Sequence, residues 1–439
     1  MKKPTIILSF LFVTLISYGT NVTGGIYSNT IWTVANSPYI VTDTVMVFPG
    51  VILTIQPGVV VKFNSNGLLE VRGSLSARGT TADSIIFTSN SSTPKASDYL
   101  GVIIETSTDT LTYCRFSYSS WGLGYDGYLG CPPVAHCAFT SNLAGISMIA
   151  SAGAAMSLDT CTFKYDTIGI ERDDEVPIIG CTFLYNGTAI NMPAGAYSPI
   201  ENCIIEYNNN GILSGMNNII THCTIDYNRD YGVTLTGGCN ISYCEIENNY
   251  IGIKSTMNNV TYNNISHNYI GIETSGGDSS GGGIFCNSFC NNTDFNFIIQ
   301  TSVDIPIKDN FWCLTDSAQI QATIYDGYQK ITLGLAFFTP FYTSPCSGTP
   351  SAINALKNNY GNVKVFPNPN NGKFSIESDM INEKSIIEIY NVLGEKVYKV
   401  NLNADITEIN LSTQPKGIYL YRVIEQNGNL IGEGKVIIE

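Results

Sequence analysis

The chain has 439 residues, of which 13% are charged, and its 22 basic and 36 acidic side chains give a net charge of −14. This negative charge repels phosphate backbones and anionic membrane surfaces, so nucleic acid is excluded as an expected partner. Glycine (41 residues) and tyrosine (26 residues) are abundant. This composition favours an extracellular β protein over a helical one.

The N-terminus has the features of an export signal. Met1-Lys2-Lys3 is positively charged, and Ile6 to Ile16 forms an apolar run. Ser17-Tyr18-Gly19 follows with small residues at which the signal could be cleaved. We therefore expect residues 1–19 to be a signal peptide. The apolar run is short for a bilayer span, and no later stretch has transmembrane character. The sequence thus predicts a mature protein outside the inner membrane, with no transmembrane segment.

Residues 20–345 are expected to form one all-β domain. It begins with alternating stretches such as Val45-Met46-Val47, which are separated by turns such as Pro49-Gly50 and Asn66-Gly67. At the other end, Ile305 to Trp312 is expected to be a closing rung in which Trp312 covers the last layer.

A cysteine returns at intervals of 20 to 24 residues through the middle of this domain. An aliphatic residue precedes each cysteine by three positions, and Phe or Ile follows it by two. A fixed period of about 20–25 residues predicts a stacked solenoid, because each coil can bury its apolar face only against its neighbours. Asn263 replaces the cysteine in the next coil, and Cys286 is expected to restore it. The repeating cysteines are Cys114, Cys137, Cys161, Cys181, Cys203, Cys223 and Cys244.

We call the place of the recurring cysteine in each coil the repeat position. A second ladder is expected five positions after it. In coils stacked about 4.8 Å apart, each amide side chain can donate to one neighbouring coil and accept from the other. The alternative is that these are ordinary surface-turn asparagines, but their recurrence in register favours the ladder. The series is Ser119, Asn142, Asp166, Asn186, Asn208, Asn228, Asn249, Asn268 and Asn291.

The repeating cysteines are expected to be small buried hydrophobic groups. Side chains in register on parallel strands run side by side, whereas a disulfide needs them to converge. One or two disulfides are possible among the remaining cysteines, without an assigned pairing. These are Cys131, Cys239, Cys290, Cys313 and Cys346.

Together the cysteine, apolar and asparagine ladders resemble the right-handed parallel β-helix of pectate-lyase-like proteins and bacterial surface proteins. The resemblance covers roughly residues 25–345 and implies that fold. It does not imply one activity, since this scaffold carries lyases, hydrolases, adhesins and spacers.

The periodicity is lost after Cys346, so residues 346–362 are expected to be a linker. Residues 363–439 contain about seven short alternating stretches, which predict a small Ig-like β-sandwich. Their motifs closely resemble the type A C-terminal sorting domain of type IX secretion in Bacteroidota. A carbohydrate-binding sandwich is the alternative. The motif positions are Pro367, Asn368, Pro369, Gly372, Gly394, Gly417, Tyr419 and Lys435.

The resemblance to a sorting domain implies a route for the whole chain. It implies Sec export, contact with the type IX secretion machinery and removal of the tail. The protein would then be secreted or attached to the outer-membrane surface.

Carboxylates that could act in catalysis or metal binding recur three positions after the repeat position. Glu206, Asp226 and Glu247 hold this position on consecutive coils, and Glu245 shares a strand with Glu247. Neighbouring coils would place them about 4.8 Å apart and alternate coils about 9.6 Å apart, near the separations that glycosidases use. Stacked acids could also bind Ca²⁺. The alternative is a solvated acidic face.

Other candidate chemistry is sparse. Arg229 and Lys254 are the basic residues near the acids, but neither lies in a recognisable lyase motif. A row of tyrosines four positions after the repeat position could stack on sugar rings or simply cover a corner of the coil. Its members are Tyr118, Tyr165, Tyr185, Tyr207 and Tyr227.

The sequence thus predicts a secreted or surface β-helix that binds polysaccharide or acts as an adhesin, as a monomer. It assigns no cofactor and leaves a requirement for Ca²⁺ open. One alternative is a polysaccharide lyase or glycoside hydrolase that uses the surface carboxylates. The other is a passive surface protein.

Overall fold

The computed structural model describes most of the chain in two compact units, residues 1–351 and 352–439, and each is described by itself. Residues 1–18 of the expected signal peptide and Gly394 of the tail motif lie outside the described residues. The described ranges are 19–105, 111–126, 133–148, 157–171, 177–193, 198–256, 258–276, 283–350, 363–377, 385–391, 396–402, 406–425 and 430–438.

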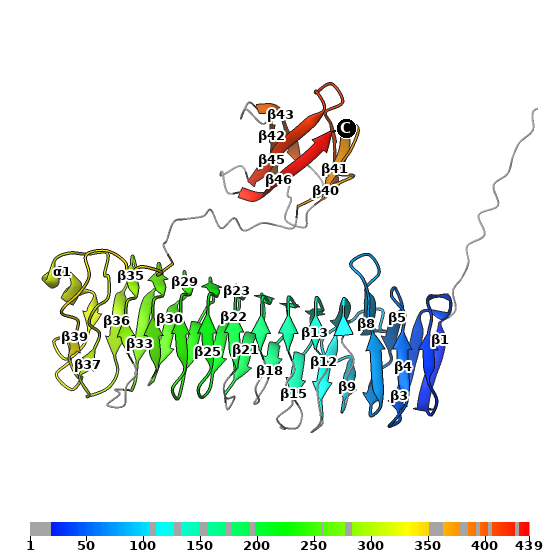
Figure 1. Ribbon diagram of the computed structural model, residues 1–439, viewed down its shortest axis with the longest axis horizontal. Coiled ribbons are helices and arrows are strands. Elements are labelled where there is room, and N and C mark those ends of the chain that lie inside the picture. Colours follow the sequence, from blue (N-terminus) through cyan, green and yellow to red (C-terminus); the bar gives the residue numbers. More distant parts are fainter. Residues whose placement is uncertain are drawn as a thin grey trace, which may run out of the picture. The chain divides into compact units, whose positions relative to one another are not determined.

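The first unit is a parallel β-solenoid, as the repeats predicted (Figure 1). Each regular coil contributes one short strand to each of three parallel sheets. The first sheet contains the strands that begin at or just after the repeat position. They are β5 (Val60–Phe63), β8 (Ile85–Ser89), β11 (Cys114–Ser117), β14 (Ala138–Thr140), β17 (Thr162–Lys164), β20 (Thr182–Leu184), β23 (Ile204–Glu206), β26 (Thr224–Asp226), β29 (Glu245–Glu247), β32 (Asn264–Ser266) and β35 (Ser288–Cys290).

The second sheet follows the first after a sharp corner in each coil. Its strands are β1 (Thr20–Ile26), β6 (Leu68–Val71), β9 (Tyr99–Ile104), β12 (Ser119–Tyr125), β15 (Ala144–Met148), β18 (Ile168–Glu171), β21 (Thr188–Met192), β24 (Asn210–Ser214), β27 (Tyr231–Leu235), β30 (Ile251–Ser255), β33 (Ile270–Thr274), β36 (Phe295–Ile299) and β38 (Ile324–Tyr325). The long strand β3 (Tyr39–Val47) serves both sheets, since its first half pairs with β5 and its second half with β6. Strand β1 pairs with both halves of β3 and therefore also serves both sheets.

The strands of the third sheet lie just before the repeat position in each coil. It begins with β2 (Thr30–Trp32), β4 (Ile52–Ile55) and β7 (Ser74–Ala77), after which an isolated bridge joins Arg78 to Thr112. The later strands are β10 (Leu111–Thr112), β13 (Val134–Ala135), β16 (Leu158–Asp159), β19 (Ile178–Ile179), β22 (Pro199–Glu201), β25 (Ile219–Thr221), β28 (Asn240–Ser242), β31 (Asn259–Thr261) and β34 (Ile284–Phe285).

The core of the solenoid is built from the predicted inward positions. Phe116, Phe139, Phe163 and Phe183 are fully buried, and their rings stack from coil to coil with centroids 4.7–5.0 Å apart. The repeating cysteines are buried free thiols, as expected. Each coil therefore buries its apolar face against the coils above and below it.

Two corner residues in each coil adopt the left-handed backbone conformation. One lies immediately before the repeat position and the other four positions after it, and we call the second the tyrosine corner. At this corner Tyr118, Ser141, Tyr165, Tyr185, Tyr207, Tyr227, Asn248 and His267 have φ between 51° and 68°. Positive φ is uncommon for residues other than glycine. Its recurrence shows that the corner geometry is set by the coil and not by one residue type.

The end of the solenoid differs from the expected single closing rung. Trp312 stacks on Phe289 with ring centroids 4.7 Å apart, as predicted, but Phe338 then packs edge-on against Trp312 at 6.2 Å. Strands β37 (Ile305–Pro306) and β39 (Ala336–Phe337) and helix α1 (Ser317–Ala322) complete this end. Asp316 caps α1 by accepting hydrogen bonds from the amides of Ala318 and Gln319.

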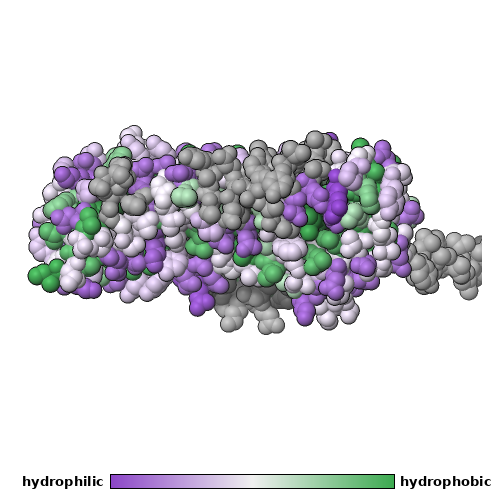
Figure 2. Space-filling model, turned by 90° about the horizontal axis from the view of Figure 1, so that it is seen from below, coloured by the Kyte–Doolittle hydropathy of each residue, from purple (hydrophilic) through white to green (hydrophobic). Residues whose placement is uncertain are grey.

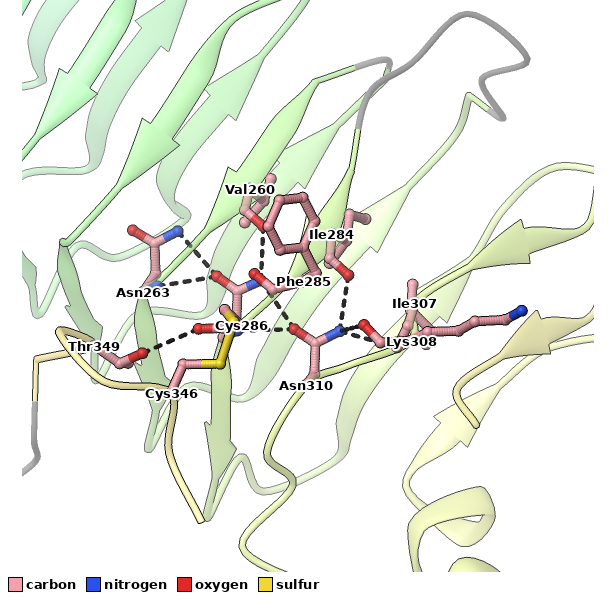
Figure 3. Close-up of a disulfide and its surroundings, with 11 residues drawn as sticks. Val260, Asn263, Ile284, Phe285, Cys286, Ile307, Lys308, Asn310, Cys346 and Thr349 are labelled. Carbon is pink, nitrogen blue, oxygen red and sulfur yellow. Dashed lines mark hydrogen bonds between the residues drawn. A yellow bond between two sulfur atoms is a disulfide. The ribbon is translucent and has the colours of Figure 1, made fainter. Parts of the chain in front are cut away.

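The expected placement of Cys286 on the ladder is wrong by one residue. The amide and side chain of Asn263 donate to Asn287 Oδ1, and those of Asn287 donate to Asn310 Oδ1, so Asn287 holds the repeat position. Cys286 lies at the preceding corner and forms a disulfide with Cys346 (Figure 3). Nearby, the Thr349 hydroxyl donates to the Cys286 carbonyl.

A second disulfide joins Cys290 to Cys313. Both residues lie three positions after Asn287 and Asn310, so they are in register on successive coils. Cys313 has a left-handed backbone conformation, with φ of 54°. Cys290 and Cys313 belong to the set in which one or two disulfides were expected, and the repeating cysteines stay free as expected.

The second unit is the expected small β-sandwich. One sheet contains β40 (Lys364–Phe366), β41 (Lys373–Glu377) and β44 (Ile406–Asn410), and the other contains β43 (Lys396–Leu402), β42 (Ser385–Tyr390), β45 (Gly417–Glu425) and β46 (Leu430–Ile438). All pairings within these two sheets are antiparallel. Phe374, Ile387, Ile389, Val423 and Val436 lie in their shared core.

Candidate functional site

The tyrosine corner is fixed from inside by a buried asparagine ladder. Asn186, Asn208, Asn228, Asn249 and Asn268 are at most 3% exposed. The amide and Nδ2 of each donate to Oδ1 of the next ladder residue over 2.9–3.1 Å. After Asn268 the acceptor is Asn292, so the expected position of Asn291 is also wrong by one residue. The ladder holds successive corners in one line.

Asp166 occupies one position of this ladder. Its Oδ1 accepts from the amide of Asn142 at 2.7 Å and from Asn142 Nδ2 at 2.9 Å. Its buried Oδ2 finds no hydrogen-bond partner among the described residues. On neighbouring coils this site holds an amide nitrogen that donates to a main-chain carbonyl, as Asn186 Nδ2 does to Phe163. Only a proton on Oδ2 could make the same bond, and burial raises the pKa of Asp166 to about 7.

Four of the predicted tyrosines form a continuous row on the outside of the corner. The ring centroids of Tyr165, Tyr185, Tyr207 and Tyr227 are 5.5, 5.3 and 5.1 Å apart along the row, and neighbouring rings are within 19° of parallel. Tyr165 is 54% exposed and Tyr227 is 45% exposed. Tyr118 lies on an earlier coil and is separated from the row by the coil of Ser141.

This stacking decides what the row can offer a ligand. The ring faces turn toward neighbouring rings that are too close to admit a sugar ring between them, so the expected stacking of sugars on these faces is not available within the row. The ring edges and the hydroxyl ends remain. Burial and nearby carboxylates raise the pKa of Tyr207 and Tyr227, so these hydroxyls stay protonated at neutral pH and can both donate and accept hydrogen bonds.

The predicted carboxylate column runs beside the tyrosine row. Glu206 of β23, Asp226 of β26 and Glu247 of β29 are direct partners in the register of the first sheet. Asp226 was expected to face solvent but is only 3% exposed. Asn248 Nδ2 donates to Asp226 at 2.9 Å, and Asn264 and Ser266 donate to Glu247 at 2.7 Å.

Other predicted site residues are not brought together. Glu245 lies two residues before Glu247 on β29, where its partner in the register is Thr224 and not an acid. Within the described ranges, no group of three or more Asp, Glu, His or Cys side chains is arranged to hold a metal ion. Lys254 lies on the second sheet, 3.6 Å from Glu273 and over the Tyr231 ring. Arg229 is exposed two residues beyond Tyr227.

A hollow that the sequence analysis missed lies near the start of the same corner. It has a volume of about 430 Å³. Asp98 shapes one wall, where it accepts from Ser89 Oγ at 2.8 Å and from the amide of Lys95 at 3.1 Å. The amide of Asp98 donates to the carbonyl of Tyr118, which connects the hollow to the corner. The lining is Phe63, Asn64, Ser65, Ser89, Asn90, Ser91 and Asp98.

Only a weak signal in the sequence pointed to this hollow. Asn64-Ser65 and Ser89-Asn90-Ser91 are short polar runs at the ends of two strands, and such runs usually mark turns. Their meeting depends on the coil register, in which Asn90 Nδ2 donates to Asn64 Oδ1 at 2.9 Å.

The predicted tail motif builds the edge of the sandwich. Asn368 binds the last strand through both ends of its amide, since Nδ2 donates to Lys435 O and Oδ1 accepts from the amide of Ile437. Gly372 has φ of 91°, and a Cβ there would lie 2.6 Å from Ser412 Cα. The Tyr419 hydroxyl donates to Pro415 O at 2.7 Å. Pro367, Pro369 and Gly417 belong to the same motif.

Two family models match the chain. Residues 100–270 match the model of the right-handed β-helix region, and residues 364–439 match that of the secretion system C-terminal sorting domain.

Individual relatives match less completely. An endo-acting ulvan lyase of Formosa agariphila is 38% identical over 68 residues, which are 15% of this chain and 13% of the relative. Among solved structures, a tailspike protein of Acinetobacter baumannii bacteriophage Fri1, described as a capsular polysaccharide depolymerase, is similar over 94% of this chain and 79% of that chain. Its TM-score is 0.30 and its sequence identity is 10%.

Proposed function

Since residues 100–270 belong to the right-handed β-helix family and residues 364–439 to the secretion system C-terminal sorting domain family, we propose that this exported solenoid binds polysaccharide along its tyrosine corner. The observation that carries the proposal is the row of four tyrosines beside the column of three carboxylates.

The sorting domain directs the chain through type IX secretion, the export route of Bacteroidota, to the cell surface or the medium. It thereby makes that secretion machinery a partner of the tail. No helix in the described ranges is long and apolar enough to cross a membrane.

The periodicity of the corner suits a polymer. Each of the four coils from Tyr165 to Tyr227 repeats one phenol hydroxyl at nearly the same spacing, and two of them add a carboxylate next to it, Glu206 beside Tyr207 and Asp226 beside Tyr227. A polysaccharide repeats its hydroxyl groups along a chain, so successive units would meet equivalent donors and acceptors. The hollow at Asn64 and Asp98 offers a polar recess toward one end of the same line.

The charge of the site favours a neutral glycan. Glu206 and Asp226 lie next to the last two tyrosines of the row, Glu247 continues their column on the following coil, and the whole chain carries a net charge of −14. An anionic polysaccharide would be repelled by this field. Lys164, whose Nζ lies 5.0 Å from the Tyr165 ring centroid, is a cation at one end of the row.

The expectation of a monomer is part of the same proposal. In the face shown in Figure 2, hydrophilic and hydrophobic residues are interspersed, and the green residues appear in separate small groups. Stable homodimer interfaces usually need a larger continuous apolar surface.

Retention on immobilised polysaccharides tests the proposed function. We expect the full chain to be retained by neutral glycans more than by anionic ones. The Tyr165→Phe/Tyr227→Phe double variant keeps the stacked rings but loses two hydroxyl groups. Each lost hydrogen bond is expected to cost about 0.5–1.5 kcal/mol, so the affinity should fall about tenfold.

The matched control is Tyr243→Phe/Tyr262→Phe, which alters a stacked pair at the other corner. It should leave retention unchanged, and an equal loss in both variants would contradict the proposed site. New reducing ends or unsaturated products would instead support the enzyme alternative, and no retention on any glycan would support a passive surface protein. Repeating the assay with a calcium chelator tests whether Ca²⁺ takes part.

A further inference from the structure

The outer face of the larger tail sheet carries three cations around one buried carboxylate. Glu388 is 2% exposed. Lys396 Nζ lies 2.6 Å and Lys399 Nζ 3.2 Å from Glu388 Oε1, while Arg422 Nη2 lies 2.7 Å from Oε2. Arg422 Nε also donates to Oε2 at 2.9 Å, and the Tyr390 hydroxyl donates to it at 2.7 Å.

The register explains why these groups meet. On strand β42, Glu388 lies directly opposite Lys399 of β43 and Arg422 of β45. Directly opposite residues of antiparallel strands share a face of the sheet, so the three side chains converge. The hydrogen bonds from Lys396, Tyr390 and the other donors hold the pKa of Glu388 well below its usual range, and the carboxylate stays charged.

The cluster holds more positive charge than the carboxylate needs. The two-atom contact of Arg422 with Glu388 already pairs one cation with one anion. Lys396 and Lys399 are therefore two further cations, with side chains 41% and 52% exposed. Arg422 and the Tyr390 hydroxyl already give the buried carboxylate a charge partner and hydrogen bonds, so the pairing of Glu388 gives little reason for both lysines.

Apolar groups lie beside these cations. The Tyr390 ring centroid is 5.3 Å from Arg422 Cζ and 5.8 Å from Lys396 Nζ. Leu420, opposite Tyr390 in the register, is 51% exposed. Tyrosine and arginine are enriched at the centres of protein interfaces, so the composition of this face suits contact with a protein.

We propose that this face of the sorting domain, centred on Lys396, Lys399 and Arg422, docks an acidic segment of a partner protein during export. The carboxylates of that segment would pair with the two exposed lysines, while Glu388 keeps all three cations oriented. Tyr390 and Leu420 would pack against the apolar part of the same segment.

The test compares two double variants of the full chain in a Bacteroidota host that carries the type IX system. Lys396→Gln/Lys399→Gln removes two charges but leaves Arg422 and Tyr390 bound to Glu388. Lys373→Gln/Lys416→Gln removes two exposed charges elsewhere on the tail. The exported fraction should fall at least tenfold for the first variant and stay near wild type for the second. Equal export of both, or an equal loss, would overturn the proposal.

Binding of purified full chain to an oligoglutamate peptide and to anionic phosphatidylglycerol vesicles separates the two sources of negative charge. We expect the peptide to bind wild type more weakly as salt rises, and the first variant to lose this binding. Binding to vesicles without binding to the peptide would contradict a protein partner. If the first variant shows a lower melting temperature, Lys399→Gln alone decides, since Lys399 makes the longer contact with Glu388.

Discussion

Replacement of Asp166 by asparagine is expected to stabilise the solenoid in alkaline solution relative to wild type, by an amount that grows as the pH rises. The pKa of Asp166 is raised by burial from 3.8 to about 7. Between these pH values the folded chain holds a proton that the unfolded chain has released. Because the folded state binds more protons there, wild type loses stability as the pH rises through this window.

The size of this effect follows from the width of the window. At about 1.4 kcal/mol per pH unit, wild type should lose about 4 kcal/mol between pH 4 and pH 8 through this one group. An asparagine has no proton to lose, and its Nδ2 can donate to a main-chain carbonyl as Asn186 Nδ2 does. The free energy difference between variant and wild type should therefore grow by that amount.

Tryptophan fluorescence during urea unfolding measures this difference in the full chain. The chain has three tryptophans, Trp32, Trp121 and Trp312, so all of them report on the solenoid. The control Asp230→Asn removes an exposed carboxylate and should show no such growth with pH. A constant difference between Asp166→Asn and wild type from pH 4 to pH 8 would exclude a protonated Asp166 in the ladder.

Removal of one ladder amide should destabilise the solenoid at every pH. Asn208 Oδ1 accepts from the amide and Nδ2 of Asn186, and Asn208 Nδ2 donates to Phe183 O, Glu206 O and Asn228 Oδ1. In Asn208→Ala at least two buried donors of Asn186 lose their acceptor. We expect a loss of about 3 kcal/mol in the free energy of unfolding, since each buried unsatisfied group costs about 1–3 kcal/mol.

The neighbouring residue provides a matched control for the ladder. Asn209 is exposed, and Asn209→Ala should change the free energy of unfolding by less than about 0.5 kcal/mol. If the two alanine variants unfold at the same urea concentration, the ladder contributes no more to stability than a surface turn does.

Much of the fold could be predicted because buried side chains of the same kind recur at the same position in each coil. Phe163 and Phe183 mark equivalent inward positions in the sequence, and they are paired in the register. The same repeat also predicted that Glu206 and Asp226 would be neighbours. A solenoid reduces the three-dimensional problem to one period, so spacing alone gives many of the contacts.

The features that could not be predicted from the sequence depend on one-residue shifts and on how side chains of neighbouring coils pack. Cys286 and Asn287 are adjacent, and only the paired strands show that Asn287 continues the ladder. Alternation predicted that Asp226 would face solvent, but its side chain is buried and accepts a hydrogen bond from Asn248 of the next coil. The ring faces of the tyrosine row are occupied because the coil spacing is shorter than the space a sugar would need, which composition does not reveal.

The hollow and the tail cation cluster were missed for a related reason. Asn64 and Asn90 are 26 residues apart, and Glu388 and Arg422 are 34 residues apart. Neither pair forms a local motif. Each depends on which strands are neighbours, and in the tail those strands are antiparallel and follow no repeat.

The most direct test of a periodic binding corner is the affinity of oligosaccharides of increasing length. Calorimetry on the full chain would use oligosaccharides of the neutral glycan that retains it. We expect the affinity to rise with each added sugar unit until the row from Tyr165 to Tyr227 is covered and then to level off, and we expect Tyr165→Phe/Tyr227→Phe to reduce the rise. Affinity that is independent of length, or a rise that the variant leaves unchanged, would contradict it.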